Sequence, residues 1–278
     1  MIAFTKMHGI GNDFVVVDAI RTGRLPDRLP ELARRMCDRR FGVGADGLIF
    51  ALPGRSAPFA MRMLNPDGSE SEMCGNGIRC LARFLADHGH AKPGPIPVET
   101  GAGTLVLELL PDGRVRVDMG PARLTRGEIG MEGPPEETFV EQPVPGFEPA
   151  IAGTAVSMGN PHLVVFVPDA GAVPLEVWGP ELERHPLFPN RVNVHFVEVL
   201  GRGRLRQRTW ERGAGATLAC GTGACAAAVA AFRTERGPRQ ATVSLPGGDL
   251  EIEYLESGNV RMTGPAESVY TGFWFAKG

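Results

Sequence analysis

The chain has 278 residues, with 29 Lys and Arg against 32 Asp and Glu, which gives a net charge of −3 at pH 7. This slightly acidic balance argues against a nucleic-acid-binding domain, since such domains are typically basic. Hydrophobic residues make up 43% of the chain, and no run reaches the roughly 18–20 apolar residues of a membrane span. We therefore expect a globular protein of roughly two domains that binds neither nucleic acid nor membrane.

The N-terminus and the cysteines indicate the compartment. Residues 1–6 lack the charged and apolar regions of a signal peptide. An odd number of cysteines favours thiols in a reducing compartment over a disulfide framework, and no pair has the Cys-x-x-Cys spacing of a zinc site. We expect a cytoplasmic protein without a bound metal. The five cysteines are Cys37, Cys74, Cys80, Cys220 and Cys225.

Short runs rich in β-branched residues dominate the chain and predict many strands. A Pro-Asp-Gly turn at residues 111–113 joins two of these runs and predicts a hairpin. The expected strands are residues 14–17, 47–52, 59–64, 105–110, 114–119, 163–167, 192–200, 205–210, 241–245, 250–255 and 260–263.

Helical patterns are fewer than strand patterns. Apolar residues at intervals of three and four predict helices at residues 26–40 and 77–88, and residues 176–184 are a further candidate helix. Residues 221–232 are apolar on nearly all sides, which is typical of a buried helix. The stretch 123–149 is rich in Gly, Pro and Glu without a clear period, and we expect a loop or a connection between domains there.

A short motif occurs twice, about half the chain apart. Residues 74–77 read Cys-Gly-Asn-Gly and residues 220–223 read Cys-Gly-Thr-Gly, and each motif opens a predicted helix. This spacing predicts two related halves that present the same structural device.

The motif suits carbanion chemistry. The first amides of a helix have no intrahelical partner and form an anion site, which can hold a carboxylate and stabilise a neighbouring thiolate. We therefore expect Cys74 and Cys220 to have lowered pKa values. If both thiols flanked one α-carbon, one could remove its proton while the other donated one on the opposite face. The remaining cysteines lack flanking glycines, and we expect them to be core residues.

Pyridoxal phosphate could stabilise the same carbanion, but it requires a Schiff-base lysine. The chain has only Lys6, Lys92 and Lys277, and none lies in a phosphate-binding loop. The sequence therefore favours a mechanism without a cofactor.

Several polar residues in turn-like settings could grip a zwitterionic substrate, because an amide both donates and accepts hydrogen bonds. Taken singly, each asparagine could equally be an ordinary turn residue, and the Glu-Arg pair a surface ion pair. A lone histidine is more often structural than catalytic. The candidates are Asn12, Asn65, Asn160, His162, Asn193, Glu211 and Arg212.

Together these motifs resemble the diaminopimelate epimerase family, and the resemblance covers nearly the whole chain. The two cysteine blocks are its most specific part. The matching segments are residues 4–14 (FTKMHGIGNDF), 65–70 (NPDGSE), 73–80 (MCGNGIRC), 158–162 (MGNPH), 211–225 (ERGAG to ACGTGAC) and 262–266 (MTGPA).

The resemblance implies a cofactor-independent epimerase that interconverts LL- and meso-2,6-diaminopimelate in lysine and peptidoglycan-precursor synthesis. It implies that Cys74 and Cys220 are the two acid/base residues. It further implies that His162 and Glu211 tune the thiols. The implied substrate-binding residues are Gly75, Asn76, Gly221 and Thr222 at the reacting carboxylate, with Asn12, Asn65, Asn160, Asn193, Glu211 and Arg212 around the rest of the substrate.

The resemblance also implies an α/β (α+β) fold of two pseudo-symmetric domains, each a β-barrel-like mixed sheet around a central helix. The expected domains are residues 1–118 with 265–278, which carry Cys74, and residues 119–264, which carry Cys220. The family typically forms homodimers.

One departure and several alternatives remain. Some family members have a binding glutamine where this chain has Gly47, so any contact there must come from the backbone. Proline or hydroxyproline racemases also use paired cysteines, but a small cyclic substrate has no distal amino-acid end for Glu211 and Arg212. Phenazine-type isomerases share the fold and lack the two cysteines. A non-catalytic amino-acid-binding protein or a thiol sensor would not exchange an α-proton.

Overall fold

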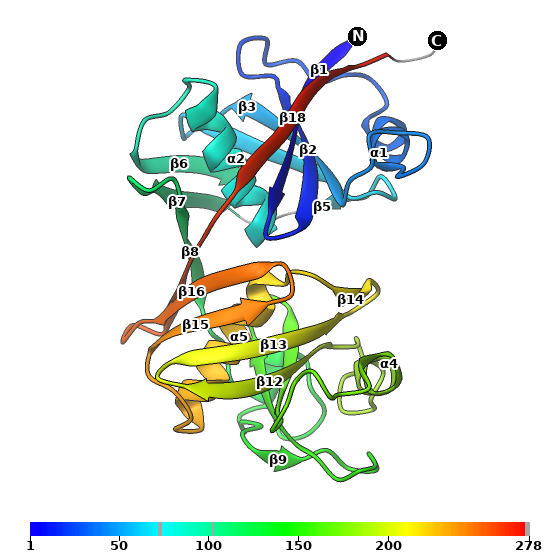
Figure 1. The fold of residues 1–278 in the computed structure, drawn as a ribbon, viewed down its shortest axis with the longest axis vertical. Helices are drawn as coiled ribbons and strands as arrows, with labels where there is room; N and C mark the ends of the chain where they lie inside the picture. Colours follow the sequence, from blue (N-terminus) through cyan, green and yellow to red (C-terminus); the bar gives the residue numbers. More distant parts are fainter. Residues whose placement is uncertain (72–73, 102, 276–278) are drawn as a thin grey trace. The chain divides into compact units, whose positions relative to one another are not determined.

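The computed structural model describes residues 1–71, 74–101 and 103–275. The chain divides into two compact units, which are described separately here (Figure 1). Unit 1 comprises Met1–Asp118 and Thr263–Gly278, and unit 2 comprises Met119–Met262. The N-terminal strand and the last strand of the chain lie side by side in unit 1.

Unit 1 is a mixed sheet with two helices. Helices α1 (Leu29–Cys37) and α2 (Gly75–Asp87) belong to it. Its strands are β1 (Ile2–Gly9), β2 (Asn12–Asp18), β3 (Gly47–Pro53), β4 (Phe59–Leu64), β5 (Glu70–Ser71), β6 (Gly94–Thr100), β7 (Gly103–Leu109), β8 (Val115–Pro121), which runs across the boundary, and β18 (Glu267–Trp274).

Unit 2 is also a mixed sheet with helices. These are α3 (Arg126–Ile129), α4 (Leu175–Glu183) and α5 (Gly221–Arg233). Its strands are β9 (Gln142–Pro143), β10 (Ala152–Ser157), β11 (Pro161–Phe166), β12 (Asn193–Gly201), β13 (Arg204–Glu211), β14 (Gly215–Thr217), β15 (Gln240–Leu245), β16 (Gly248–Tyr254) and β17 (Asn259–Gly264), which also reaches the boundary.

The two units repeat one order of strand pairing. In unit 1, β2 pairs antiparallel with β1 and parallel with β3, β4 pairs antiparallel with β3 and β5 and parallel with β6, and β6 pairs antiparallel with β7. In unit 2, the strands β10, β11, β12, β13, β14, β15 and β16 pair in the same sequence of directions. The internal repeat expected from the two cysteine motifs is confirmed.

A buried helix packs against the strands of each unit. Helix α2 contacts β1, β2, β3 and β7, and α5 contacts β10, β11, β15 and β16. Helix α5 is built largely of alanine and is buried on nearly every side, as its apolar sequence predicts. Both helices have 13 residues and begin directly after a cysteine of the repeated motif. The expected fold, a β-barrel-like mixed sheet around a central helix, is confirmed.

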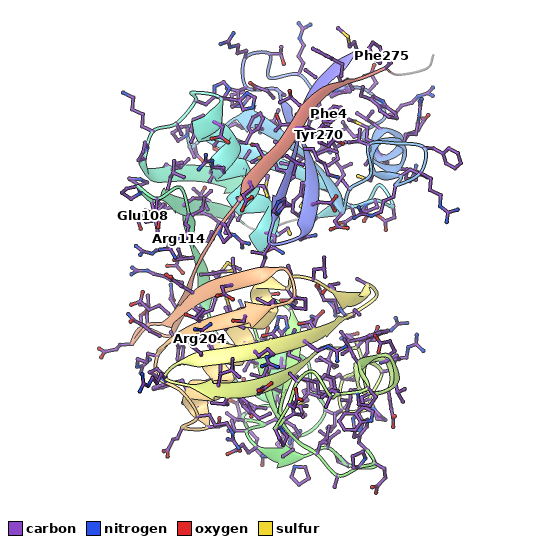
Figure 2. All side chains as sticks on the ribbon, viewed as in Figure 1. Phe4, Glu108, Arg114, Arg204, Tyr270 and Phe275 are labelled. Carbon is purple, nitrogen blue, oxygen red and sulfur yellow. The ribbon has the colours of Figure 1, made fainter. Side chains whose placement is uncertain are left out.

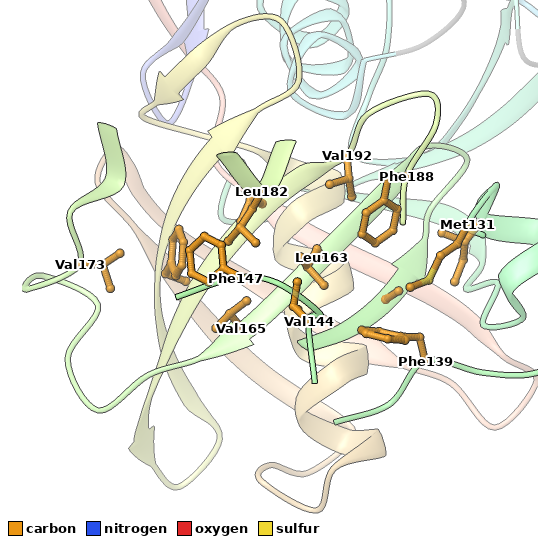
Figure 3. Packing of buried hydrophobic residues seen from close by; sticks show 14 of the residues in the cluster. Met131, Phe139, Val144, Phe147, Leu163, Val165, Val173, Leu182, Phe188 and Val192 are labelled. Atoms are coloured by element: carbon orange, nitrogen blue, oxygen red, sulfur yellow. The ribbon is translucent and has the colours of Figure 1, made fainter. Parts of the chain in front are cut away.

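The stretch 123–149 is part of unit 2 and does not connect the units, which corrects the expectation of a domain connection. It contains α3 and β9, and its apolar side chains enter the core of the unit. Met131, Phe139, Val144 and Phe147 pack against Leu163 and its neighbours (Figure 3). The sequence does not reveal this role, because the apolar residues of this irregular segment are not spaced with the period of a helix or a strand.

Several strands were missed by the sequence patterns. Strand β1 carries the buried polar residues Thr5 and Lys6, which interrupt its apolar run. Strand β6 contains Pro95 and Pro97, which argue against a strand in sequence. Both strands form because the neighbouring strands supply hydrogen bonds that a local pattern does not reveal.

Within the described residues, no helix is both long and apolar enough to cross a membrane.

Candidate active site

Cys74 is the N-cap residue of α2. Its backbone is extended, and its sulfur accepts a hydrogen bond from the Gly77 amide at 3.5 Å. The side chain is half-buried, and the helix begins at Gly75. The amides of the first helical turn therefore lie beside the thiol, as the motif predicts. Met73, which precedes Cys74 in the expected motif, lies outside the described residues.

Asn12 lies beside this thiol at the start of β2. Its Oδ1 accepts a hydrogen bond from Asn76 Nδ2 at 3.0 Å and a long contact from the Cys74 sulfur at 3.9 Å. Its Nδ2 donates to Asp46 Oδ2 at 2.6 Å. The Asp46 carboxylate only accepts, so it fixes the Asn12 amide with the oxygen toward Cys74.

The turn before Asn12 is a strained one. Ile10 has a φ of 49° and Gly11 a φ of 86°. A left-handed conformation is rare for a β-branched residue, and such strain persists only where surrounding structure imposes it. Ile10 is buried, so packing holds the turn that delivers Asn12 to the thiol.

A charged network braces the same turn. Asp13 bonds Lys6 and Arg39, and Arg39 also bonds Asp46 at 2.6 Å. Burial opposes ionisation of Asp13, but the hydrogen bonds from Arg39 and Lys6 outweigh it and hold the pKa of Asp13 at about 2. Lys6 also bonds the Gly44 carbonyl, so its ammonium group is part of this network. The other two lysines of the sequence argument are Lys92 and Lys277, of which Lys277 lies outside the described residues.

Asn76 and Arg79 complete the group of residues around Cys74 at the start of α2, which we call the first half-site; the corresponding group around Cys220 is the second. Asn76 is buried in the first turn of α2, and its Oδ1 accepts a hydrogen bond from Arg79 Nη2 at 2.9 Å. Arg79 is fully buried and also donates to the Gly75 carbonyl at 3.1 Å and to the Pro265 carbonyl at 3.3 Å. A buried cation needs such partners. Arg79 therefore ties the start of α2 to the returning end of the chain.

Asn65 lies in a turn after β4. Its Nδ2 donates to Ser69 Oγ at 3.0 Å, and its backbone bonds Ser69 and Gly68. These contacts are those of a turn residue, and its role in substrate binding stays a prediction. Gly47 is buried, and a Cβ there would lie 2.9 Å from Met63 Cε, so this chain has no room for a side chain without a shift.

Cys220 is the N-cap residue of α5, the same position that Cys74 has in α2. Burial raises the pKa of the Cys220 thiol well above its ordinary value, and the negative charge of Glu211 raises it further. The Gly223 amide and the Thr222 hydroxyl act in the opposite direction without reversing the shift. The expected lowering of this pKa is therefore wrong, because desolvation outweighs the field of the helix terminus.

Glu211 ends β13 close to this thiol. Its Oε1 accepts a hydrogen bond from Thr217 Oγ1 at 2.6 Å, and its carboxylate also accepts one from Cys220. A carboxylate in this position stabilises the protonated thiol and can receive its proton. Glu211 is therefore placed to act on Cys220, and the exposed guanidinium of Arg212 donates to the Asn190 carbonyl at 3.0 Å.

His162 lies in a buried row of hydrogen-bonded polar side chains, which is made of Asn160, His162, His195, Gln207 and Thr209. Its Nε2 bonds Asn160 Oδ1 at 2.9 Å, and its Nδ1 bonds His195 Nε2 at 2.9 Å. Burial lowers the pKa of His162 well below its ordinary value, and the nearby His195 adds to the shift. Burial therefore favours the neutral form of His162, and its expected role in tuning the thiols stays a prediction.

The row continues in both directions. Asn160 Nδ2 donates to Thr222 Oγ1 at 3.5 Å, and Thr222 Oγ1 lies 3.8 Å from the Cys220 sulfur. On the other side, His195 Nδ1 bonds Gln207 Nε2 and Thr209 Oγ1, each at 3.0 Å. The row links the core of unit 2 to the start of α5.

Three of these side chains have the composition of a metal site. One nitrogen of each of His162 and His195 and the Cys220 sulfur lie within 4.8 Å of one another. All four ring nitrogens already have hydrogen-bond partners, so the arrangement is satisfied without a metal ion.

Asn193 begins β12 and is buried. Its Nδ2 donates to the Pro161 carbonyl at 2.9 Å, and its Oδ1 accepts from the Arg212 amide at 3.0 Å. The side chain therefore holds the loop that carries Arg212, and direct substrate binding by Asn193 stays a prediction.

The sequence argument missed four residues that support the site. Asp46 directly precedes Gly47, and His195 lies inside the expected strand 192–200, but the sequence motifs singled out neither residue. Two features of the sequence could have indicated them. Asp46 is a carboxylate directly before a strand, and His195 is a polar residue inside a buried strand, where polar side chains need hydrogen-bond partners. The four are Asp46, Arg79, His195 and Gln207. Of the cysteines expected in the core, Cys37, Cys80 and Cys225 are all buried.

Comparison with known proteins covers most of the chain. The sequence profile of the diaminopimelate epimerase family matches residues 4–125 and 154–269. The diaminopimelate epimerase of Pelotomaculum thermopropionicum is 54% identical over 273 residues, which is 97% of each chain. Diaminopimelate epimerase 1 of a Nostoc species (strain PCC 7120) is 52% identical over 276 residues, covering 98% of this chain and 99% of its own.

Solved structures show the same fold at low identity. A phenazine biosynthesis protein of the PhzF family from Bacillus anthracis superposes with a TM-score of 0.70 at 16% identity and covers 98% of both chains. A hydroxyproline epimerase from Agrobacterium vitis superposes with a TM-score of 0.67 at 16% identity, covering 98% of this chain and 91% of its own. The sequence matches are far more specific, and together they establish that this chain belongs to the diaminopimelate epimerase family and is an isomerase.

Proposed function

We propose that the enzyme interconverts LL- and meso-2,6-diaminopimelate without a cofactor, using Cys74 and Cys220 as the two acid/base residues. The observation that carries the proposal is the repeated half-site. In each unit a cysteine caps a 13-residue buried helix at the same point of the same strand order. Each half-site thus joins a proton-transfer group to helix amides that suit a carboxylate. Such an activity would serve lysine and peptidoglycan-precursor synthesis.

The proposed reaction needs one thiolate and one thiol at the same substrate carbon. With Cys74 as the base, Cys220 is the acid, and its raised pKa favours the protonated form that this role requires. In the reverse direction Cys220 must lose its proton, and the Glu211 carboxylate that accepts its hydrogen bond is the group to receive it. The amides of Gly75, Asn76, Gly221 and Thr222 would then stabilise the charge on the reacting carboxylate.

The remaining polar residues are proposed to hold the substrate. Asn12 Oδ1 lies 3.9 Å from the Cys74 sulfur. Asn160 is linked to Cys220 through Thr222, whose hydroxyl lies 3.5 Å from Asn160 Nδ2 and 3.8 Å from the Cys220 sulfur. Arg212 is exposed on its loop and suits the distal carboxylate, as an arginine forms paired hydrogen bonds with such a group. We assign Asn65, Asn193 and Glu211 to the same substrate.

The function is tested by isotope exchange. Reduced protein incubated with LL-diaminopimelate in D₂O, without added cofactor, should lose the substrate α-proton signal in the NMR spectrum and accumulate the meso isomer. Cys74→Ser and Cys220→Ser should each keep the fold and lower turnover by about 10²- to 10⁴-fold, the usual contribution of a general acid or base. Cys37→Ala is the matched control, because Cys37 is buried in α1, and it should retain turnover.

The outcomes separate the alternatives. Persistence of the α-proton with diaminopimelate but its loss with proline would assign a small cyclic substrate instead. Persistence with both would leave a binding or sensing role. Loss of folding in a serine variant would return that cysteine to a structural role.

We further infer that the enzyme works in the cytoplasm as a homodimer. Thiols that must cycle between acid and base forms require a reducing compartment. Large apolar side chains are exposed on β18 and just after it, namely Val269, Tyr270, Phe273 and Phe275. Figure 2 labels Tyr270 and Phe275. Phe273 and Phe275 alternate along the chain and share one face, and we propose these two side chains as part of an interaction surface. Phe273→Asp should shift the protein toward a monomer in light scattering, while Leu218→Asp, an exposed residue of unit 2, should not.

A further inference from the structure

The orientation of the Gln207 amide gives the buried row in unit 2 a direction. Gln207 Nε2 can only donate, and it lies 3.0 Å from His195 Nδ1 and 2.9 Å from Thr209 Oγ1. Gln207 Oε1 is buried without a hydrogen-bond partner among the described residues, and turning this amide by 180° would reverse the row. In the orientation that the structure has, His195 Nδ1 accepts, which places the proton of this neutral ring on Nε2. His195 Nε2 then donates to His162 Nδ1 at 2.9 Å.

The same logic continues to Asn160. Since His162 Nδ1 accepts, its proton lies on Nε2, which donates to Asn160 Oδ1 at 2.9 Å. The Asn160 oxygen is thereby turned inward, and its NH₂ group faces Thr222 Oγ1 at 3.5 Å. Burial lowers the pKa of His195 to about 3 and that of His162 well below its ordinary value. Burial therefore favours neutral rings, and the hydrogen bonds from His195 through His162 to Asn160 all run in the same direction.

We propose that His195 and Gln207 are positioning residues that fix the tautomer of His162 and so keep the NH₂ group of Asn160 turned toward the start of α5. In this orientation the Asn160 NH₂ group donates toward the start of α5. A flipped Asn160 amide would place its oxygen there, and that oxygen can only accept. A carboxylate held at the same helix start requires donors. This inference rests on the proposed function only in giving Asn160 a substrate to bind.

The geometry leaves the His195 ring little freedom to take another role. Its side chain is fully buried, and Gly223 in α5 packs directly against it. Its two nitrogens bond three partners from β11 and β13. His195 is held between the Gln207 amide and His162. It therefore fixes the orientation of His162 without contacting the substrate.

The first test is made on the wild-type protein and needs no activity. With ¹⁵N-labelled histidine at pH 7, long-range ¹H–¹⁵N correlation spectra should show a pyridine-like Nδ1 and a pyrrole-like Nε2 for both His162 and His195. The opposite tautomer on either ring, or a charged ring, would overturn the proposal. A failure of the proposed epimerisation would leave this spectrum unchanged, so the two failures are distinguishable.

The second test uses a matched pair of substitutions. His195→Gln keeps an NH donor near the position of Nε2, whereas His195→Phe keeps the ring volume and removes the donor. His195→Phe should lower kcat/KM by about 10- to 100-fold, as expected when a substrate-contacting group loses its orientation. It should also release His162 into mixed tautomers, while His195→Gln should retain most of the activity and the wild-type tautomer.

A purely structural role predicts a different pattern. In that case both substitutions would change the melting temperature alike and leave the His162 tautomer and kcat/KM unaffected in the folded protein. His185→Phe is the control, because this histidine bonds the Pro145 carbonyl on the surface of the same unit. Equal kcat/KM for His195→Phe and the wild type would refute the proposal.

Discussion

Gly223→Ala tests whether the His195 ring occupies the space beside the start of α5. Gly223 is the third residue of that helix, and an added Cβ would lie 2.2 Å from His195 Cε1 and 2.8 Å from both ring nitrogens. The ring cannot retreat easily, because it is fully buried and bonded at both nitrogens. The substitution therefore forces the ring or the helix to move.

The magnitude follows from two opposing terms. Alanine stabilises a helix relative to glycine by about 1 kcal/mol. Overpacking a tight core usually costs about 1–3 kcal/mol, and an overlap this large belongs at the upper end, about 3 kcal/mol. The net loss is about 2 kcal/mol, which corresponds to a melting temperature lower by about 4–8 °C for a protein of this size.

The matched control is Gly77→Ala, at the same position of α2. There an added Cβ would lie 3.1 Å from Ile49 Cδ1 and 3.4 Å from both Met63 Sδ and Cys74 Cβ, so this variant is a control for stability and not for activity. The ends of these flexible side chains can shift by a few tenths of an ångström, so the helix term offsets the crowding and stability should change by less than about 1 kcal/mol.

The assay is thermal and urea unfolding of reduced protein, followed by circular dichroism, with kcat/KM measured on the same samples. Gly223→Ala should be less stable than Gly77→Ala and should also lose activity, because displacing His195 breaks the row that orients Asn160. If Gly223→Ala melts at or above the wild-type temperature with full activity, the packing described for His195 is wrong.

Three further outcomes are expected. Glu211→Gln should lower the pKa of Cys220, because it removes the neighbouring negative charge; this is seen as faster iodoacetamide alkylation at a given pH, and an unchanged pH profile would count against the contact. Arg39→Met should weaken the protein in acid: the pKa of Asp13 is lowered to about 2, so its stabilisation is present above its ordinary pKa of 3.8 and is lost as the pH falls toward 2. The acid-unfolding midpoint should therefore move to higher pH when Arg39 is removed, and an unmoved midpoint would show that Lys6 alone suffices. Oxidation should join Cys74 to Cys220 and abolish activity until a reductant is added, as the proposed two-base mechanism brings both thiols to one carbon; full activity in a sample without titratable thiols would contradict that mechanism.

The two cysteine motifs predicted more of the fold than any other feature. Their spacing indicated two related halves, and the strand order repeats around α2 and α5 as expected. The sequence predicted this repeat because a helix start flanked by glycines is a motif of a few consecutive residues. The helix of residues 221–232 was equally readable, since a helix that is apolar on all sides must be buried.

The supporting residues were much harder to predict. Asp46 and Asn12 meet only because β2 and β3 pair in parallel, and His195 reaches His162 only because β12 pairs with β11. These partners lie 34 and 33 residues apart in sequence. A local pattern contains no information about such a distance.

The sequence by itself determined the repeated helix starts, the two thiols at their N-caps and the family to which the chain belongs, because each is a property of a short segment or of whole-chain similarity. Only the tertiary structure decided the protonation of the groups around them. Burial, and not the helix terminus, sets the pKa of Cys220, and burial keeps His162 and His195 neutral. The physical reason is that desolvation depends on what surrounds a group in three dimensions, whereas the helix field can be read from the residues beside it in the chain.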